Sequence, residues 1–230
     1  MTDQSTALQL VFSGDPALFA IVRLSLAVSL SATLLGALLG APLGAFIALS
    51  RFPGRQAVVV ALNALMGLPP VVVGLAIYLL LSRSGPLGSF GLLFTAPAMV
   101  ITQTILVLPI IAALTRQTIE DLWLEYRDEL AAMGVGPLQR VRTLLWDARF
   151  SLVTALLAGF GRAAAEVGSI IIVGGNIEGF TRTMTTTIAL ETSKGNLSLA
   201  IGLGIILLGI VLAVNIAAWV VKQVGARFER

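Results

Sequence analysis

The sequence predicts an all-α integral membrane protein with about five transmembrane helices. Two observations carry this prediction. Of the 230 residues, 57% are hydrophobic and only 12% are charged, whereas roughly 25% are charged in a soluble domain. Five apolar segments are also long enough to cross a bilayer, which takes about 20 helical residues. We therefore expect a single transmembrane domain over residues 1–230, inserted as a multi-pass protein.

The first apolar segment covers residues 17–49 and is longer than one perpendicular crossing requires. It could tilt as one helix, or begin as a surface helix near Arg23. Small residues recur along one of its faces at four-residue spacing, and such faces let helix backbones approach closely in lipid. These residues are Ala32, Gly36, Gly40 and Gly44.

The other four expected spans cover residues 58–81, 94–115, 151–173 and 197–221. A proline pair interrupts the second span at Leu68-Pro69-Pro70, where helical hydrogen bonds must be lost. We interpret this break as a packing kink, with a gate hinge as the alternative. In the fourth span, Gly161, Ala165 and Ser169 would form a second small-residue face.

The distribution of Lys and Arg predicts the orientation in the membrane. The loops on one side and the C-terminal tail hold ten of the 15 basic residues, and the opposite side holds three. Cytoplasmic loops carry the excess of Lys and Arg, so we expect the N-terminus outside and the C-terminus in the cytoplasm. Because these residues sit at span ends, we interpret them as topology determinants and expect no nucleic-acid partner.

The expected cytoplasmic loop at residues 116–150 is rich in charge, with five Arg and six acids. Its pattern predicts a continuation of the third span, a break at Gly134–Pro137 and a second helix, since Pro suits the first helical position. A loop this helical indicates a surface for another protein; the alternative is a loop whose charges merely keep it in water. One face of the second helix is apolar, at Leu138, Val141, Leu144 and Leu145.

The fourth span carries two opposite charges, Arg162 and Glu166, one helical turn apart. A lone charge at the bilayer centre costs about 2.5–3.5 kcal/mol on insertion scales, and charges at this spacing can pair. The pair either fixes helix packing or lines a substrate path or gate.

The next segment, residues 174–187, lies outside by this topology and contains five threonine hydroxyls beside one arginine. Neutral hydrogen-bond donors around a single cation can bind an oxyanion, and because there are few fixed charges the anion can also be released. The alternative is an ordinary polar outer loop with threonine-rich β-turns. The candidate residues of a path or gate are Arg162, Glu166, Asn176, Thr181, Arg182, Thr183 and Thr185.

Several chemistries are excluded by what the chain lacks. It contains no Cys and no His, which removes disulfides, thiol and imidazole catalysis and most zinc or iron sites. It also lacks the Gly-x-x-x-x-Gly-Lys-[Ser/Thr] phosphate loop of nucleotide-binding subunits. We expect no catalytic residue, no metal and no cofactor in this chain. A stand-alone secondary transporter or channel is disfavoured because Glu166 is the one acid well inside a predicted span.

The 116–150 loop resembles the coupling loop of ABC-importer permease subunits, whose signature is Glu-Ala-Ala, three residues and Gly. Gly134 matches the signature Gly, and Asp128-Glu129-Leu130 stands at the Glu-Ala-Ala positions; Asp147 stands where the family often has Pro. The resemblance implies that this loop inserts a short helix into a groove of an ATPase subunit. The residues expected to couple are Asp128, Glu129, Ala131, Ala132, Gly134, Gly136, Pro137 and Arg140.

Two further runs resemble the oxyanion branch of these permeases, which imports molybdate, tungstate or sulfate. They are LAGFGRAAAEVG at 157–168 and MTTTIALETSKG at 184–195, and both are most similar to tungstate-specific permeases.

The resemblance implies the fold of a type I ABC importer permease, present as a homodimer in the cell inner membrane. It also implies two kinds of partner: a cytoplasmic ABC ATPase subunit, which would bind ATP and Mg, and an extracytoplasmic substrate-binding protein. The implied function is ATP-driven import of tungstate, with molybdate or sulfate as the alternative cargo.

Overall fold

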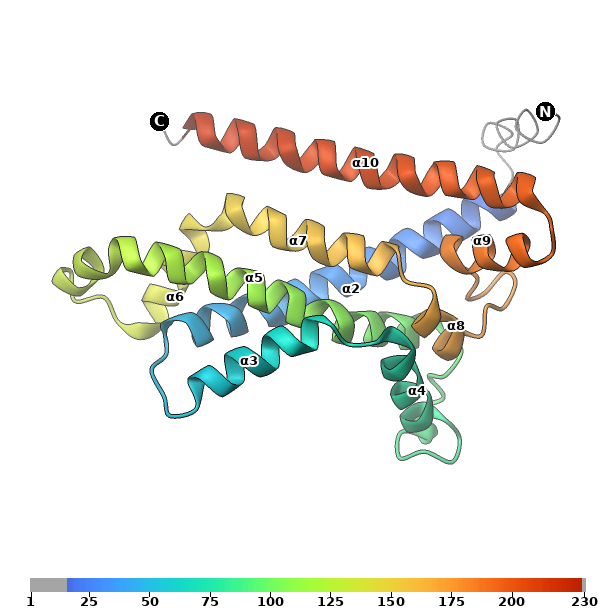
Figure 1. Cartoon of the computed structure of the whole chain (residues 1–230), viewed down its shortest axis with the longest axis horizontal. Coiled ribbons are helices and arrows are strands. Elements are labelled where there is room, and N and C mark those ends of the chain that lie inside the picture. The colour runs from blue at the N-terminus through green and yellow to red at the C-terminus, as the bar shows by residue number, and fades with distance from the viewer. Residues whose placement is uncertain (1–15, 229–230) are drawn as a thin grey trace. The chain divides into compact units, whose positions relative to one another are not determined.

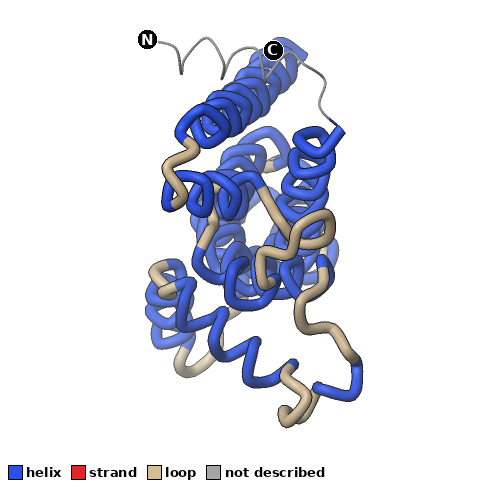
Figure 2. The backbone as a smooth tube through the Cα atoms, turned by 90° about the vertical axis from the view of Figure 1, so that its right-hand side faces the viewer, coloured by secondary structure: helices blue, strands red, loops and turns tan. Residues whose placement is uncertain are grey.

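The computed structural model describes residues 16–228, with side chains up to 223. Within this range the chain forms helices joined by short loops and no strands (Figure 2). The helices group into two compact units. The first unit comprises the residues up to 32, 69–103 and 161–214, and the second comprises 33–68, 104–160 and the residues from 215 onward. The expectation of one transmembrane domain over 1–230 stays a prediction.

The first apolar segment is one continuous helix, α2 (Pro16–Leu49), of 34 residues (Figure 1). At 1.5 Å per residue its length is about 51 Å, well beyond the roughly 30 Å of a hydrocarbon core. Of the two alternatives drawn from the sequence, a single long helix is therefore the one observed.

The predicted small-residue face of α2 packs against α5 (Ala96–Ala132) within the second unit. Gly36 and Gly40 both face α5, and at Gly44 an added Cβ would collide with the carbonyl oxygen of Ala112. Because these glycines have no side chain, the two backbones can touch. In lipid, where the hydrophobic effect does not drive helices together, such close contact stabilises the pair through dispersion. This part of the sequence interpretation is confirmed.

The second expected span, residues 58–81, is interrupted where the sequence predicts a break. The structure has two helices here, α3 (Arg55–Met66) and α4 (Pro70–Leu81). Helix α3 ends at its C-cap, Gly67, and α4 begins with Pro70 at its first position, where no backbone N–H is needed. The break therefore falls at the predicted proline pair, and the part of the chain on each side belongs to a different compact unit.

The third expected span and the charged loop form a continuous structure. A 3₁₀ turn, η1 (Gly88–Phe90), precedes α5, which has 37 residues and continues 17 residues past position 115. Helix α6 (Pro137–Asp147) follows, and α7 (Arg149–Ala164) departs from it at an angle of 76°. The predicted order of span, extension, glycine break and second helix is confirmed.

The fourth expected span is broken. Helix α7 ends at Ala164, and the short helix α8 (Gly168–Gly174) begins after three intervening residues. The predicted small-residue face over Gly161, Ala165 and Ser169 therefore does not exist as one helical face, and a Cβ on Gly161 would meet open space. Ser169 instead packs against Gly74 of α4 in the first unit.

The hydroxyl-rich segment is partly helical. Helix α9 (Met184–Ser193) begins inside it, so Thr185, Thr186 and Thr187 are helical and buried, and the β-turn alternative is wrong for them. The last apolar segment is α10 (Leu197–Phe228).

Three helices in the described range are long and apolar enough to cross a membrane: α2, α5 and α10. The broken pairs α3–α4 and α6–α7 raise the number to as many as five, in agreement with the predicted count. Arg227, Arg230 and residues 1–15, which bear on the expected orientation, lie outside the described side chains. The orientation itself stays a prediction.

Candidate functional sites

The turn between α5 and α6 is built by its glycines and proline. Gly134 has a φ of 64°, in the left-handed region that glycine adopts without strain. The N–H of Val135 then reaches back to the carbonyl of Leu130, at 3.2 Å, and satisfies an orphan group of α5. Gly136 is the N-cap of α6, and Pro137 occupies its first position. These residues fix the direction in which α6 leaves α5.

Helix α6 is anchored by a small core of the second unit. Leu144 is fully buried together with Ile119 and Leu130 of α5 and two alanines of α2. Leu138 was expected on the same face, but 83% of it is exposed. Trp146 is also exposed. Helix α6 therefore has an anchored apolar face and, besides it, apolar side chains that no described part of the chain covers.

The predicted coupling residues divide by exposure. Those around the end of α5 are exposed, and so are the residues of the turn: Asp128, Glu129, Ala131, Ala132, Gly134, Gly136 and Pro137. Arg140 is partly buried instead; its Nε donates to the carbonyl of Val135 at 2.7 Å, and its guanidinium lies 5.6 Å from the Trp123 ring centre. Arg140 therefore also holds the turn together, which charge counting alone does not reveal.

A three-residue ion cluster that the sequence did not suggest lies beside this site. Glu120 accepts from Arg116, one helical turn earlier, and from Arg55 of α3. Arg55 also donates through Nε to the carbonyl of Ile47, at 2.9 Å, and so covers the C-terminal end of α2. Sixty-five positions separate Arg55 from Glu120, so no local pattern could have linked them.

In the first unit, Arg162 and Glu166 form the predicted pair, with 2.5 Å between Nη1 and Oε2. The pair does not lie within one helix, because α7 ends between the two residues. Glu166 is 4% exposed and its second oxygen accepts from the N–H of Ser169, at 3.0 Å. One buried carboxylate thus neutralises a cation and satisfies a backbone donor at the start of α8.

The threonine hydroxyls are bonded within the chain. Thr181 donates to the carbonyl of Gly174 at 2.5 Å. Thr183 is the N-cap of α9 and forms a reciprocal capping box with Thr186. Thr185 donates to the backbone carbonyl of Glu166 at 2.8 Å. The bond of Thr185 attaches α9 to the α7–α8 break, and all of these bonds leave the hydroxyls less available than the sequence suggested.

The remaining path candidates carry unsatisfied polar atoms. Asn176 adopts a left-handed φ of 50°, and its buried Oδ1 has no hydrogen-bond partner. Arg182 pairs with Glu178 at 3.4 Å, while its buried Nε has no partner. Buried polar atoms without a partner are uncommon in proteins and point to water or a ligand.

Three polar residues near this region were missed. Gln103 of α5 is 1% exposed; its amide donates to the carbonyl of Ala163 at 3.1 Å, and its Oε1 has no partner. Ser25 of α2 accepts from the N–H of Met184 at 2.7 Å. Ser169 has a buried, unpartnered hydroxyl. A glutamine in the middle of an apolar span was a signal that could have identified Gln103.

The two predicted groups fall into different units. All path candidates belong to the first unit and all coupling candidates to the second. Among residues 16–228, no three His, Cys, Asp or Glu side chains gather where they could hold a metal. The two groups consist of ion pairs and helix caps, which fix the helices relative to their neighbours in the same unit, and of an exposed helix that could contact another protein. The roles of the individual residues stay predictions.

Comparisons with known proteins place the chain in a family. Residues 40–225 match the family described as binding-protein-dependent transport system inner membrane component. The chain belongs to this family and is a multi-pass membrane permease of the ABC transporter class.

Individual relatives match nearly the whole chain. A probable anion ABC transporter permease of Haloferax volcanii is 44% identical, covering 92% of this chain and 90% of that protein. The tungstate uptake system permease protein TupB of Campylobacter jejuni is 37% identical, with 94% and 91% covered. TupB of Peptoclostridium acidaminophilum is 38% identical, with 94% and 95% covered. The sulfate permease CysW of Synechocystis is 29% identical over 70% of this chain.

Proposed function

We propose that this chain is the permease of an ATP-driven importer of tungstate. The observation that carries the proposal is the similarity to two tungstate uptake permeases along 94% of the chain. The sulfate permease, by contrast, is less similar and covers less of it. Molybdate and sulfate are the alternative cargoes, because all three are tetrahedral oxyanions that the same kind of donor set binds.

The chain would act within an assembly. Two copies would form the translocation path, a substrate-binding protein would deliver the anion from outside, and ATPase subunits would bind ATP and Mg and carry out hydrolysis. This chain would itself catalyse no reaction. Helix α6 and the end of α5 would be the contact with the ATPase, since this region combines exposed charges with the exposed Leu138.

The path would offer weak binding. In the first unit Arg162 is 28% exposed, but its charge is largely compensated by Glu166. A compensated cation can attract an oxyanion without trapping it, and a path that binds too tightly blocks flow. The threonines would act mainly by holding Glu166 and α9 in place, with Thr185 as the direct link.

The test is uptake by proteoliposomes that hold the permease and its ATPase subunit, with the binding protein outside and ATP inside. Accumulation of labelled tungstate should require ATP. A tenfold excess of unlabelled tungstate should reduce this accumulation more than the same excess of molybdate or sulfate. Uptake at the same rate without ATP would overturn the importer class. Stronger competition by molybdate or sulfate would reassign the cargo.

A further inference from the structure

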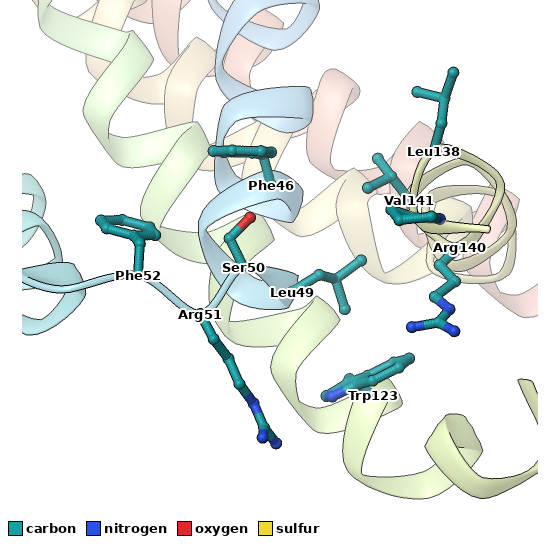
Figure 3. A pocket seen from close by; sticks show the side chains of 10 residues that line it. Phe46, Leu49, Ser50, Arg51, Phe52, Trp123, Leu138, Arg140 and Val141 are labelled. Atoms are coloured by element: carbon teal, nitrogen blue, oxygen red, sulfur yellow. The ribbon is translucent and has the colours of Figure 1, made fainter. Parts of the chain in front are cut away.

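A groove in the second unit borders the proposed ATPase contact on α6, but it also takes in the end of α2, to which the function proposed above gives no role. Its volume is 740 Å³, and it lies between the end of α2, helix α5 and the start of α6 (Figure 3). Apolar walls come from all three helices: Phe46 and Leu49 from α2, Trp123 from α5 and Leu138 from α6. Phe46 is 58% exposed and Leu138 is the more exposed of the two. The groove is therefore open at Phe46 and Leu138, whereas Leu49 and Trp123 are partly buried against the core of the second unit.

The charges of the groove are all of one sign. Its lining residues include Arg51 and Arg140 and no acid. In Figure 3 both guanidinium groups point away from Phe46 and Leu138, so the groove has an apolar end and a cationic end. Arg140 is held in place by its bond to Val135 and its position near the Trp123 ring. An anion at this end would meet a cation that is already positioned, which lowers the entropy cost of binding.

The end of α2 does not oppose an anion here. The last carbonyls of a helix carry partial negative charge, which repels anions. At α2 the carbonyls of Ile47 and Ala48 both accept hydrogen bonds from Arg55. Their charge is therefore compensated, and the field at this end of the groove is set by arginine.

The position of the groove along α2 indicates what surrounds each of its ends. Phe46 lies one turn before the helix ends at Leu49, and Arg51 follows that end. The apolar end of the groove thus faces the apolar helix α2, and the cationic end faces the loop that follows it. The distribution of Lys and Arg predicts that this is the cytoplasmic side, where the leaflet carries anionic lipids. A small oxyanion would need no apolar walls, whereas a phospholipid has both an acyl chain and a phosphate.

We propose that this groove binds one anionic phospholipid. Its phosphate lies between Arg51 and Arg140, and one acyl chain lies along Phe46 and Leu49. The lipid bridges the end of α2 to α6 and supports the position of α6. This inference does not rest on the identity of the transported anion.

The experiment uses Trp123 as a reporter. The chain has three tryptophans; changing Trp146 and Trp219 to Phe leaves Trp123 alone. The purified full-length permease is placed in phosphatidylcholine vesicles that contain increasing fractions of brominated phosphatidylglycerol or brominated phosphatidylcholine, because bromine quenches tryptophan on contact. Phosphatidylglycerol should reach half-maximal quenching at a several-fold lower mole fraction than phosphatidylcholine.

Arg51→Ala is the diagnostic variant, because Arg51 is exposed and lies outside the helices. Losing the charge-assisted contact of Arg51 with the lipid phosphate should weaken the preference for phosphatidylglycerol roughly tenfold, as expected for about 1.5 kcal/mol. Arg127→Ala is the matched control: Arg127 is exposed on α5 and does not line the groove. The preference of the Arg127→Ala variant for phosphatidylglycerol should stay unchanged.

Two results would overturn the proposal. One is equal quenching by both lipids. The other is an equal loss of preference in Arg51→Ala and Arg127→Ala, which would indicate a general surface charge. If both lipids quench equally and the ATPase subunit shields Trp123, the groove belongs to the protein partner. Size-exclusion chromatography of each variant checks that the fold is retained.

Discussion

At the scale of single residues, Glu166 connects more elements than any sequence pattern indicated. Its side chain pairs with Arg162 and accepts from the start of α8, and its backbone carbonyl accepts from Thr185 of α9. A buried carboxylate with two such partners is costly to disturb, because each partner would be left unsatisfied in a low dielectric. The residue therefore holds the α7–α8 break and α9 in one arrangement.

We expect Glu166→Gln and Glu166→Ala to separate the two tasks of this side chain. The glutamine keeps an acceptor for Ser169 but removes the charge that compensates Arg162; the alanine removes both. Uptake should fall in both variants, and the alanine variant should lose about 1–3 kcal/mol more stability. Thermal unfolding in detergent and uptake in proteoliposomes measure this. Equal stability of the two variants would mean that the bond to Ser169 contributes nothing.

Glu191 should give the permease a component of stability that depends on pH. Hydrogen bonds from Lys194 and Asn196, at 2.9 Å each, hold the pKa of the Glu191 carboxyl below its usual range. Because the pKa is lowered on folding, this stabilisation is fully present above the unfolded pKa of about 4.3 and is lost as pH falls through the folded value. Glu191→Gln should lower the melting temperature at pH 7, and this difference should be smaller at about pH 3, below the unfolded pKa.

The control for this test is Glu178→Gln, since Glu178 is exposed and its ion pair with Arg182 is long. Its melting temperature should differ little from that of the unchanged chain at either pH. A Glu191→Gln deficit that persists undiminished in acid would contradict the assignment.

At the scale of elements, close approach of α2 and α5 is the feature that the sequence predicted best. A four-residue spacing of small residues is a local pattern with one physical use in lipid, and it leads to Gly44 directly. The helix breaks were less accessible. The proline pair predicted the end of α3, whereas no proline or comparable signal marked the end of α7 at Ala164. One contact at that break, from Thr185 to the carbonyl of Glu166, spans 19 positions and is not readable from a local pattern.

Gly44→Val should destabilise the permease, and Gly209→Val should not. A side chain at Gly44 must collide with the backbone of α5, whereas a Cβ at Gly209 of α10 meets open space. Overpacking in a well-packed contact costs typically 1–3 kcal/mol. The melting temperatures of the two variants in the same detergent test this difference, and matching values would rule out a packing role for Gly44.

At the scale of the whole molecule, the sequence supplied the class of protein and the order of its parts, while chemical detail came from the structure. Composition and span length predicted a multi-pass helical protein, and the turn at Gly134–Pro137 was predicted to the residue. For the hydroxyl-rich segment, composition cannot reveal that Thr183 and Thr185 are already bonded, and their role in a path stays a prediction. It also cannot reveal that Arg140 donates to the carbonyl of Val135; the coupling role of Arg140 stays a prediction.

The separation of path and coupling candidates into two units leads to the last prediction. A permease driven by a separate ATPase subunit must contact that subunit at one place and move the substrate at another. Because the coupling candidates all lie in the second unit, we expect contacts with the ATPase to depend on the second unit alone. Glu129 is exposed at the end of α5 and makes no described bond that its loss would break, unlike Arg140. A substitution of Glu129 therefore tests the ATPase contact more specifically than a substitution of Arg140.

Glu129→Lys should reduce co-purification of the ATPase subunit about tenfold or more, because placing a like charge in an interface costs several kcal/mol. Asp121→Lys is the matched control, being an exposed acid on α5 two turns farther from Gly134. Both variants should insert at unchanged levels, since neither position is buried. Pull-down of the ATPase from detergent extracts at fixed ionic strength compares them. If Glu129→Lys retained the ATPase as well as Asp121→Lys, the end of α5 would not be part of the contact, and the force would have to enter through another element of the second unit.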